Sequence, residues 1–505
     1  MNEKFRYVLK SFSWGLISKL IDAGSKLITV PLLISYFGKV DFGLITLAIS
    51  VNAYLQLLDL GMNTGAVKYF SVWIEQKKYK LLDYVSRTTI SFYGIIGIIN
   101  AIVLLFIAFY GIKYFDLEDC QVEAMQEMLF ILSFLAIVNW GASVFNQLLV
   151  ANHKIAIVQQ VMIVRSLLSL LLVYITVYFN VGIVTYFWWF SIINSIQIIP
   201  LAYIVKKDKL IKNYMPAFKW NLFQPVLKYS LAIIAIGVFS MTATKMRPVI
   251  LSLFGTEGIG IVTEFRIMET ITLFIISIGG MLIKIFLPIS SKIVLNNNPK
   301  EMSNFAQTAT FYTTVICVLL CFPIVINSQA ILRIYVGDEY INLSDWLVIW
   351  IFTIVAYLHN SPVSSLVLAT GRTKILIISS GISCVLSLIV NALLCDVFGV
   401  GSAIIGYGLY ILIQMSFYYI YFNRKILQLD SKAIFISFII PLFCGIVPLL
   451  FLNMVKFRIN SIYLDMLARF FVWIGVFGFL LVVTNKIEGK GRLQLNALVN
   501  RNLFR

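Results

Sequence analysis

The sequence SFSWGLISKLIDAGSKLITVPLLISY, residues 11–36, has the length and apolarity of a membrane-spanning helix but carries charges in its interior. A helix crosses a bilayer with about 20 apolar residues. Lys19, Asp22 and Lys26 follow one another at spacings of three and four, which places all three on one helix face. Each charge would cost about 2.5–3.5 kcal/mol at the bilayer centre. We therefore expect this face to meet protein or a water-filled cavity. A static salt bridge, in which Asp22 neutralises both lysines, is the structural alternative.

The end of this stretch recurs later in the chain. Residues 31–38, PLLISYFG, are matched 217 positions later by residues 248–255, PVILSLFG. Gly43 and Thr46 then recur in the same register as Gly260 and Thr263. The second copy is also preceded by cations, Lys245 and Arg247, and its proline predicts a kink. We infer two homologous halves, each opened by a charged helix, which is typical of transporters built from repeats.

The composition is that of a polytopic membrane protein. Of the 505 residues, 60% are hydrophobic and only 12% are charged, and the mean hydropathy is +0.91. The net charge of +17 would suggest a nucleic-acid partner in a soluble protein, but here the basic residues lie in short loops between apolar runs. We therefore expect a lipid bilayer and no nucleic acid. The first apolar run is too long and too charged for a cleaved signal peptide.

Fourteen candidate spans can be placed along the chain, which predicts an all-α membrane protein. They cover residues 11–35, 43–66, 87–111, 127–150, 155–179, 182–205, 226–253, 259–288, 305–327, 345–370, 375–397, 400–422, 433–455 and 463–484. An even number of spans puts both termini on one side of the membrane. One alternating set of loops holds most of the loop lysines and arginines, so both termini are expected to be cytoplasmic.

The repeat and the spans together predict the domain organisation. Residues 1–205 would form an N-lobe of six helices and residues 226–423 a C-lobe of six, joined by a basic cytoplasmic linker at 206–225. Residues 424–505 would add two helices and a cytoplasmic tail. The loops are too short for an attached catalytic or ATPase domain. Cys317 and Cys321 are one turn apart, but with no nearby histidine or carboxylate we expect buried thiols and no metal site.

Polar residues form a stripe along the second span. Asn52, Gln56, Asp59 and Asn63 are spaced by four, three and four residues. Such side chains either hydrogen-bond helices together or line a cavity. Their position beside the charged first span favours the cavity.

Charged residues recur in the fifth, seventh and eighth spans. Arg165 lies in the middle of the fifth span, where it either pairs with Asp59 or lines the cavity. Glu264 points away from the charged face of its helix and is expected to pair with an outer cation or another helix. The candidate cavity residues are Lys19, Asp22, Lys26, Asn52, Gln56, Asp59, Asn63, Arg165, Lys245, Arg247, Arg266, Glu269 and Lys284. In the interior of the first, second, fifth, seventh and eighth spans, seven cations stand against four carboxylates, which favours an anionic ligand such as phosphate or diphosphate.

His359 is one of only two histidines and precedes Pro362 in the tenth span. A lone membrane histidine more often makes a hydrogen bond between helices than carries protons. If transport is coupled to protons, the candidate carriers are Asp22, Asp59, Glu264, Glu269 and His359.

Two motifs resemble a known family. Residues 35–44, SYFGKVDFGL, and residues 57–68, LLDLGMNTGAVK, are similar to the N-terminal signature of bacterial polysaccharide-biosynthesis flippases of the Wzx type. That family belongs to the MOP superfamily, with the MATE drug exporters and the lipid II flippase MurJ. The signature covers the first two spans, whereas the number and grouping of spans match over nearly the whole chain.

The resemblance implies two pseudo-symmetric six-helix lobes around a central cationic cavity lined by the first, second, seventh and eighth spans. Lys19 and Lys26 occupy the part of the first helix where such transporters carry cations, and Asp59 is the acidic residue of the LDLG-like motif. Lys245, Arg247, Arg266 and Lys284 match by position on equivalent helices only.

These features lead to the hypothesis of a flippase, not an enzyme, in the bacterial inner membrane. It would move polyprenyl-diphosphate-linked oligosaccharide repeat units for O-antigen, capsule or exopolysaccharide synthesis by alternating access, with Lys19, Lys26 and Arg247 holding the diphosphate. A polymerase and a chain-length regulator would be partners, and no cofactor is expected beyond coupling to H⁺ or Na⁺, or none if polymerisation drives the flux. A MATE-like exporter and a lipid II-type flippase are the alternatives.

Overall fold

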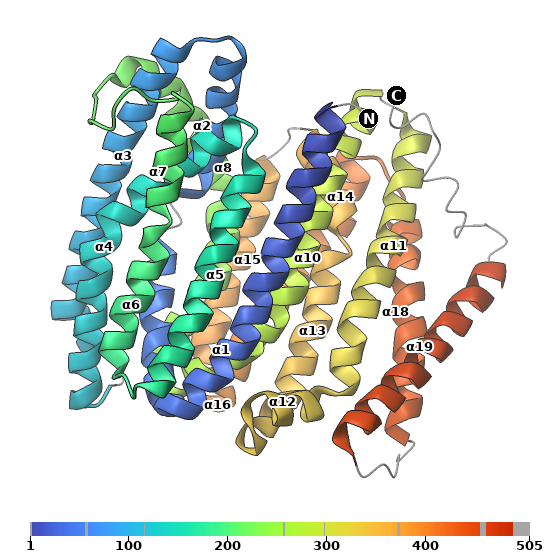
Figure 1. Ribbon diagram of the computed structural model, residues 1–505. Helices are drawn as coiled ribbons and strands as arrows, with labels where there is room; N and C mark the ends of the chain where they lie inside the picture. Colours follow the sequence, from blue (N-terminus) through green and yellow to red (C-terminus); the bar gives the residue numbers. More distant parts are fainter. Residues whose placement is uncertain are drawn as a thin grey trace. The chain divides into compact units, whose positions relative to one another are not determined.

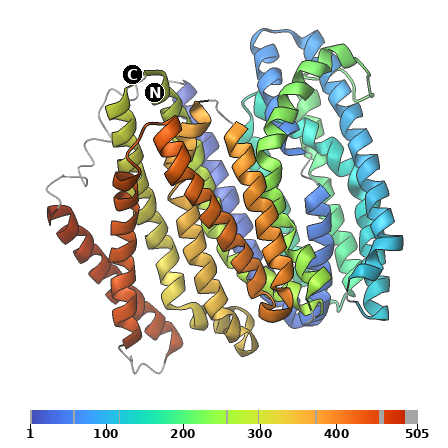
Figure 2. The same cartoon turned by 180° about the vertical axis from the view of Figure 1, so that it is seen from behind.

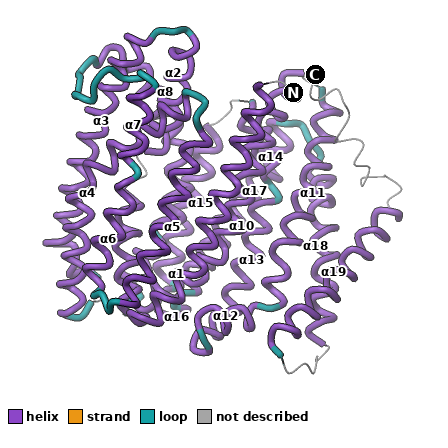
Figure 3. The backbone as a smooth tube through the Cα atoms, in the orientation of Figure 1, coloured by secondary structure: helices purple, strands orange, loops and turns teal. Residues whose placement is uncertain are grey.

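The computed structural model describes residues 3–55, 59–115, 117–255, 258–296, 298–370, 374–454 and 461–487. Every regular element in these ranges is a helix (Figure 3). The predicted tail after residue 487 lies outside the described residues, as does Gln56 of the polar stripe.

The α-helices are α1 Glu3–Leu55, α2 Asp59–Glu75, α3 Tyr79–Phe106, α4 Asp119–Ala151, α5 Ile155–Tyr178, α6 Ile183–Ile196, α7 Ile198–Lys207, α8 Trp220–Lys245, α9 Arg247–Phe254, α10 Gly260–Asn296, α11 Pro299–Ile326, α12 Ser328–Val336, α13 Ser344–Leu358, α14 Ser361–Ala369, α15 Lys374–Leu393, α16 Cys395–Phe398, α17 Gly401–Phe417, α18 Ser431–Met454 and α19 Ile462–Ile487. Four shorter helices complete the set, namely η2 Ile107–Gly111, η3 Ile112–Tyr114, η4 Asp338–Leu343 and η5 Tyr418–Ile426.

The prediction of an all-α, multi-pass membrane protein is confirmed. Within the described part of the chain, eleven helices are long and apolar enough to cross a membrane. The second predicted span differs most in its limits. Its first part belongs to α1, beyond the non-helical Gly38, and its last part belongs to α2, which extends to Glu75. The predicted seventh span is divided between α8 and α9, because Pro248 stands in the first turn of α9.

The chain packs as two compact units. Unit 1 comprises Met1–Thr270 with Ser380–Tyr407, and unit 2 comprises Ile271–Ser379 with Gly408–Arg505. The division into lobes at 1–205, 206–225, 226–423 and 424–505 stays a prediction.

Unit 1 contains the helices that carry most of the predicted charged residues. Its core lies where α2, α3, α4 and α8 pack, around buried residues such as Phe70, Tyr93, Leu148 and Phe223. Helix α5 packs along α1, as Figure 1 shows. The α1–α5 pair therefore places the charged first span against a second helix that also carries a charge, Arg165.

Unit 2 has its own core, formed by the end of α10 with α14 and η5 around Leu366 and Phe422. Helix α18 packs along α11, which can be followed in Figure 2. Trp473 of α19 stacks on Phe322 of α11 at 5.8 Å between ring centroids and donates a hydrogen bond to the Gly445 carbonyl. These contacts attach the last two helices to the rest of unit 2.

The two copies of the repeat meet inside unit 1 at their glycines. Gly38 has φ +86°, a conformation that glycine adopts at little cost and that ends the first helical segment. Five residues on, a Cβ at Gly43 would lie 2.6 Å from the Ile259 carbonyl oxygen. A Cβ at the equivalent Gly260 would lie 2.9 Å from Cε of Lys39. The recurrent glycines thus allow the starts of the two post-break helices to approach each other closely.

Gly43→Ala should destabilise the protein, because the new methyl group would meet backbone that cannot move without displacing α10. Overpacking of this kind costs about 1–3 kcal/mol. Gly94→Ala on α3 is the matched control, since nothing lies within 4 Å of its Cβ position. Thermal unfolding of the purified protein in detergent should show a lowered midpoint for Gly43→Ala and an unchanged or raised one for Gly94→Ala. Equal midpoints would contradict the close approach.

Candidate binding site in unit 1

The first charged pair of the site joins two helices. Lys26 donates to Asp22 at 2.7 Å, one turn apart on α1. The other carboxylate oxygen of Asp22 accepts a hydrogen bond from the Ser166 hydroxyl of α5 at 3.3 Å. Arg165, next to Ser166, also interacts electrostatically with Asp22. Asp22 is therefore surrounded by two cations, as expected if its charge is stabilised by protein rather than by lipid.

A second charged group forms where α8, α9 and α10 meet. Arg266 donates to Glu269 at 2.5 Å on α10. Lys245, the last residue of α8, and Arg247, the first of α9, also act electrostatically on Glu269. The break between α8 and α9 brings these two cations to the same carboxylate.

Arg247 is packed inside unit 1, with only 3% of its surface exposed. Its Nε donates to the Ala243 carbonyl at 2.8 Å, and its guanidinium lies 4.0 Å from the centre of the Tyr407 ring. A cation over an aromatic face is stabilised by the ring quadrupole. Arg247 therefore has interaction partners inside the protein, whereas 40% of the Lys26 side chain is exposed.

The two charged groups form one network. Lys26 lies within electrostatic range of both Arg165 and Arg266, and the three cations repel one another, so positive charge is concentrated between the α1–α5 pair and α10. In the described residues this network contains five cations and two carboxylates. The cations are Lys26, Arg165, Lys245, Arg247 and Arg266, and the carboxylates are Asp22 and Glu269. The excess of positive charge inside membrane-spanning helices favours an anionic ligand.

Glu264 belongs to a different contact. Its carboxylate accepts from Lys39 at 2.5 Å, and the neighbouring Thr263 hydroxyl donates to the Lys39 carbonyl, also at 2.5 Å. Glu264 thus pairs with a cation of the predicted outer loop, as the helix-face argument anticipated. The contact lies at the meeting of the two repeat copies.

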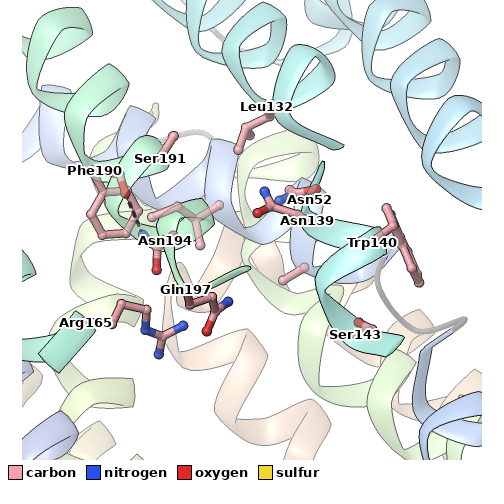
Figure 4. Close-up of a pocket in the computed structure, with 12 residues that line it drawn as sticks. Asn52, Leu132, Asn139, Trp140, Ser143, Arg165, Phe190, Ser191, Asn194 and Gln197 are labelled. Carbon is pink, nitrogen blue, oxygen red and sulfur yellow. Dashed lines mark hydrogen bonds between the residues drawn. The ribbon is translucent and has the colours of Figure 1, made fainter. Parts of the chain in front are cut away.

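A polar cavity of about 310 Å³ lies within unit 1 beside this network. It is bounded by α1, α4, α5 and the α6–α7 region, and Figure 4 shows the residues that line it. Arg165, Asn194 and Gln197 lie along one side, with Asn52 and Asn139 across from them (Figure 4). A smaller cavity of about 120 Å³ adjoins it, lined by Asn139, Ser143, Arg165 and Gln197 among others. The volume is at the lower end of the range for ligand sites, about 300–1,000 Å³.

The structure brings together some of the predicted site residues and adds others. Asp22, Lys26, Arg165, Lys245, Arg247, Arg266 and Glu269 lie in the network, and Asn52 lines the cavity. Lys19 is exposed on α1. Asp59 and Asn63 lie on α2 and Lys284 on α10, with side chains outside the described part, so a pairing of Arg165 with Asp59 is not addressed.

Sequence reasoning missed the polar residues of α4 and α6. Asn139, Ser143, Ser191, Asn194 and Gln197 line the cavity, but none belongs to a motif. Their spacing was a usable signal, because Asn139 and Ser143 are four residues apart and Ser191, Asn194 and Gln197 are three apart, so each set shares a helix face.

His359 belongs to unit 2 and is not among the residues that line this cavity. It is fully buried at the end of α13, and its Nε2 lies 3.0 Å from the Tyr419 hydroxyl of η5. Its ring stacks on Phe438 of α18 at 3.9 Å. His359 therefore makes the contact between helices that was the more frequent expectation for a lone membrane histidine.

Comparisons with known proteins found one family model and several solved structures that this chain resembles. The MatE family model matches residues 288–393, a minor part of the chain. No curated protein matches the sequence. Among solved structures, lipid II flippase MurJ in an inward closed conformation aligns with a TM-score of 0.75 at 15% identity, over 96% of this chain and 100% of that chain.

Two MATE transporters align as well. An inward-facing multidrug resistance MATE family transporter of the MOP superfamily gives a TM-score of 0.65 at 15% identity, over 87% of this chain and 99% of that one. The Vibrio cholerae MATE transporter VcmN in its bent form gives 0.53 at 14% identity, over 86% and 98%. At these identities the likeness shows the fold. The chain is a multi-pass membrane protein with the two-lobed fold of MATE transporters and MurJ.

Reversing the charges of the Lys39–Glu264 pair should reveal their coupling. Lys39→Glu would place two carboxylates together and Glu264→Lys two cations, so each variant should unfold at lower temperature than the parent. The double variant restores opposite charges and should recover most of the loss, as expected for residues in direct contact. Additive effects in thermal unfolding would contradict the pairing.

Proposed function

We propose that this protein is a flippase that moves polyprenyl-diphosphate-linked oligosaccharide repeat units across the bacterial inner membrane for O-antigen, capsular or exopolysaccharide synthesis. The fold supports transport, since MurJ is named as a lipid II flippase and the other relatives as transporters. The motifs at residues 35–44 and 57–68 support the polysaccharide-biosynthesis branch.

The observation that carries the proposal is the positive network in unit 1, with five cations against two carboxylates. Buried unpaired charge is expensive in a membrane, so an excess of cations needs a compensating anion. A diphosphate supplies two negative groups and the acceptor oxygens that Arg and Lys donors bind.

Lys26 and Lys19 are the residues we assign to direct contact with the diphosphate. Both are more accessible than Arg247, which has internal partners and contributes through its positive field. A bound diphosphate would compete with Asp22 for Lys26. Release of that ion pair would then couple ligand binding to the α1–α5 contact, through Ser166. Alternating access of two lobes would expose the site to each side of the membrane in turn.

The remaining parts of the proposal concern location and partners. Both termini would be cytoplasmic, and a polymerase and chain-length regulator of the same pathway would take the product. Protons carried by Asp22, Asp59, Glu264, Glu269 or His359, a Na⁺ gradient, or the pull of polymerisation would drive transport.

An ion-coupled exporter is the second candidate function, and the MatE match over residues 288–393 favours it. An exporter of organic cations would, however, need a site with excess negative charge. Transport of lipid II is a closer alternative, because that cargo also joins a diphosphate to a polyprenyl chain and sugars. Essentiality of the gene would favour lipid II.

Lys26→Ala should abolish surface glycan without removing the protein from the membrane, because the substrate would lose a phosphate contact. Lys26→Arg keeps the charge and should retain part of the activity. Lys113→Ala in η3 removes a loop lysine and should leave transport unchanged. Surface polysaccharide and membrane protein level are measured together in a complemented deletion strain. Full activity of Lys26→Ala would refute the assignment of Lys26.

Deletion of the gene tests the proposed function itself. The deletion strain should accumulate polyprenyl-diphosphate-linked repeat units in its extracted lipids and lose surface glycan. Unchanged lipids and glycan, together with new sensitivity to cationic drugs, would contradict the flippase function and favour that of an exporter.

A further inference from the structure

An apolar groove of about 450 Å³ runs along the surface of unit 1 between α5 and the α6–α7 region. One wall is formed by α5, with Val161, Val164 and Leu168, and the other by Ile196 and Ile199. Val164 and Ile199 are 56% and 63% exposed, so both stand at the open surface of these apolar helices.

Beside the groove, the helix that faces α5 is interrupted. Helix α6 ends at Ile196 and α7 begins at Ile198. Pro200 has no amide hydrogen to donate to the carbonyl of Ile196, and its ring crowds that carbonyl. The helical hydrogen-bond pattern is therefore interrupted at Gln197, within the predicted sixth span, although the backbone there keeps helical angles, φ −55° and ψ −23°.

The groove and the polar cavity share a boundary. Arg165 and Gln197 line the 310 Å³ cavity, the 120 Å³ cavity and the apolar groove. One guanidinium and one amide thus line both the polar cavity and the apolar groove. The site therefore offers a polar, a cationic and an apolar environment in that order. These would suit the polar head, the anionic junction and the hydrocarbon chain of a lipid-linked molecule.

The polar cavity has the chemistry of a sugar site. Three asparagines and Gln197 offer both donors and acceptors, and Trp140 offers an aromatic surface. The Ser191 hydroxyl is buried and has no hydrogen-bond partner among the described residues. A buried polar atom in this state is costly, so a ligand hydroxyl in the cavity would satisfy it.

We propose that this composite site in unit 1 binds the lipid-linked glycan, with sugar in the polar cavity, phosphate on Arg165 and the polyprenyl chain in the groove between α5 and α6–α7. The assignment rests on the proposed function and adds to it the sugar-binding residues and the path of the lipid tail. Arg165 also interacts with Asp22, which links this site to the Lys26 network. The chain would then remain in hydrocarbon while the head is held inside unit 1.

Photocrosslinking in the full-length protein tests the path of the tail. We would place p-benzoyl-phenylalanine at Val164 or Ile199 in the groove, and at Ile102 on α3 as the control. Ile102 is 59% exposed, which matches the two groove positions. The probes are radiolabelled polyprenyl diphosphate carrying an oligosaccharide and, separately, uncharged polyprenol, each in membranes of phospholipid.

The groove positions should crosslink the charged probe at least fivefold more than Ile102. Arg165→Gln should lower this labelling by the diphosphate probe and leave that by polyprenol unchanged. Equal labelling at all three positions, or crosslinks to phospholipid only, would overturn the assignment.

An export assay with groove variants separates this inference from the proposed function. Ile199→Trp and Val164→Trp would fill the groove and should reduce glycan export at least tenfold, whereas Ile102→Trp should have no effect. If all three variants export glycan normally, the flippase function stands and the groove assignment is wrong. If the parent protein itself fails to restore glycan export to the deletion strain, the proposed function fails.

Discussion

The structure depends on how charges are held inside membrane-spanning helices. Asp22 and Glu269 each neutralise part of a group of cations, and Lys26 lies within electrostatic range of Arg165 and of Arg266. Hydrocarbon would not solvate any of these side chains, so the helices that carry them must turn the charges toward protein or ligand. The remaining positive charge is the basis for proposing an anionic cargo, and the hydrogen bond from Ser166 to Asp22 joins α1 to α5.

The backbone that holds these charges is shaped by breaks and close approaches. Gly38 ends the first segment of α1, Pro248 stands in the first turn of α9 just after Met246, and Pro200 follows the interruption between α6 and α7. Each break lies next to a charged or polar element of the site. Interrupted helices are common near transporter binding sites, because cavity-lining backbone can depart from helical geometry without meeting lipid.

The sequence predicted the helices well because hydropathy reports directly on the requirement to cross a bilayer. It also predicted the charged face of the first span, since residues three and four apart on a helix share a side. It did not predict that Arg247 would be buried against Tyr407, a contact between residues far apart in the chain. The cavity amides, such as Asn194, were missed for the same reason. Their spacings of three and four put them on common helix faces, but only tertiary packing shows that these faces line one cavity.

The central claim is that the protein moves an anionic, lipid-linked glycan between leaflets. Purified protein in vesicles, loaded with polyprenyl-diphosphate-linked oligosaccharide, allows its transfer to be followed with a membrane-impermeant sugar-modifying reagent. The account predicts that the reagent reaches the inner-leaflet pool rapidly with the parent protein, and at the protein-free rate with Lys26→Ala. Equal rates in vesicles with and without the parent protein would contradict it.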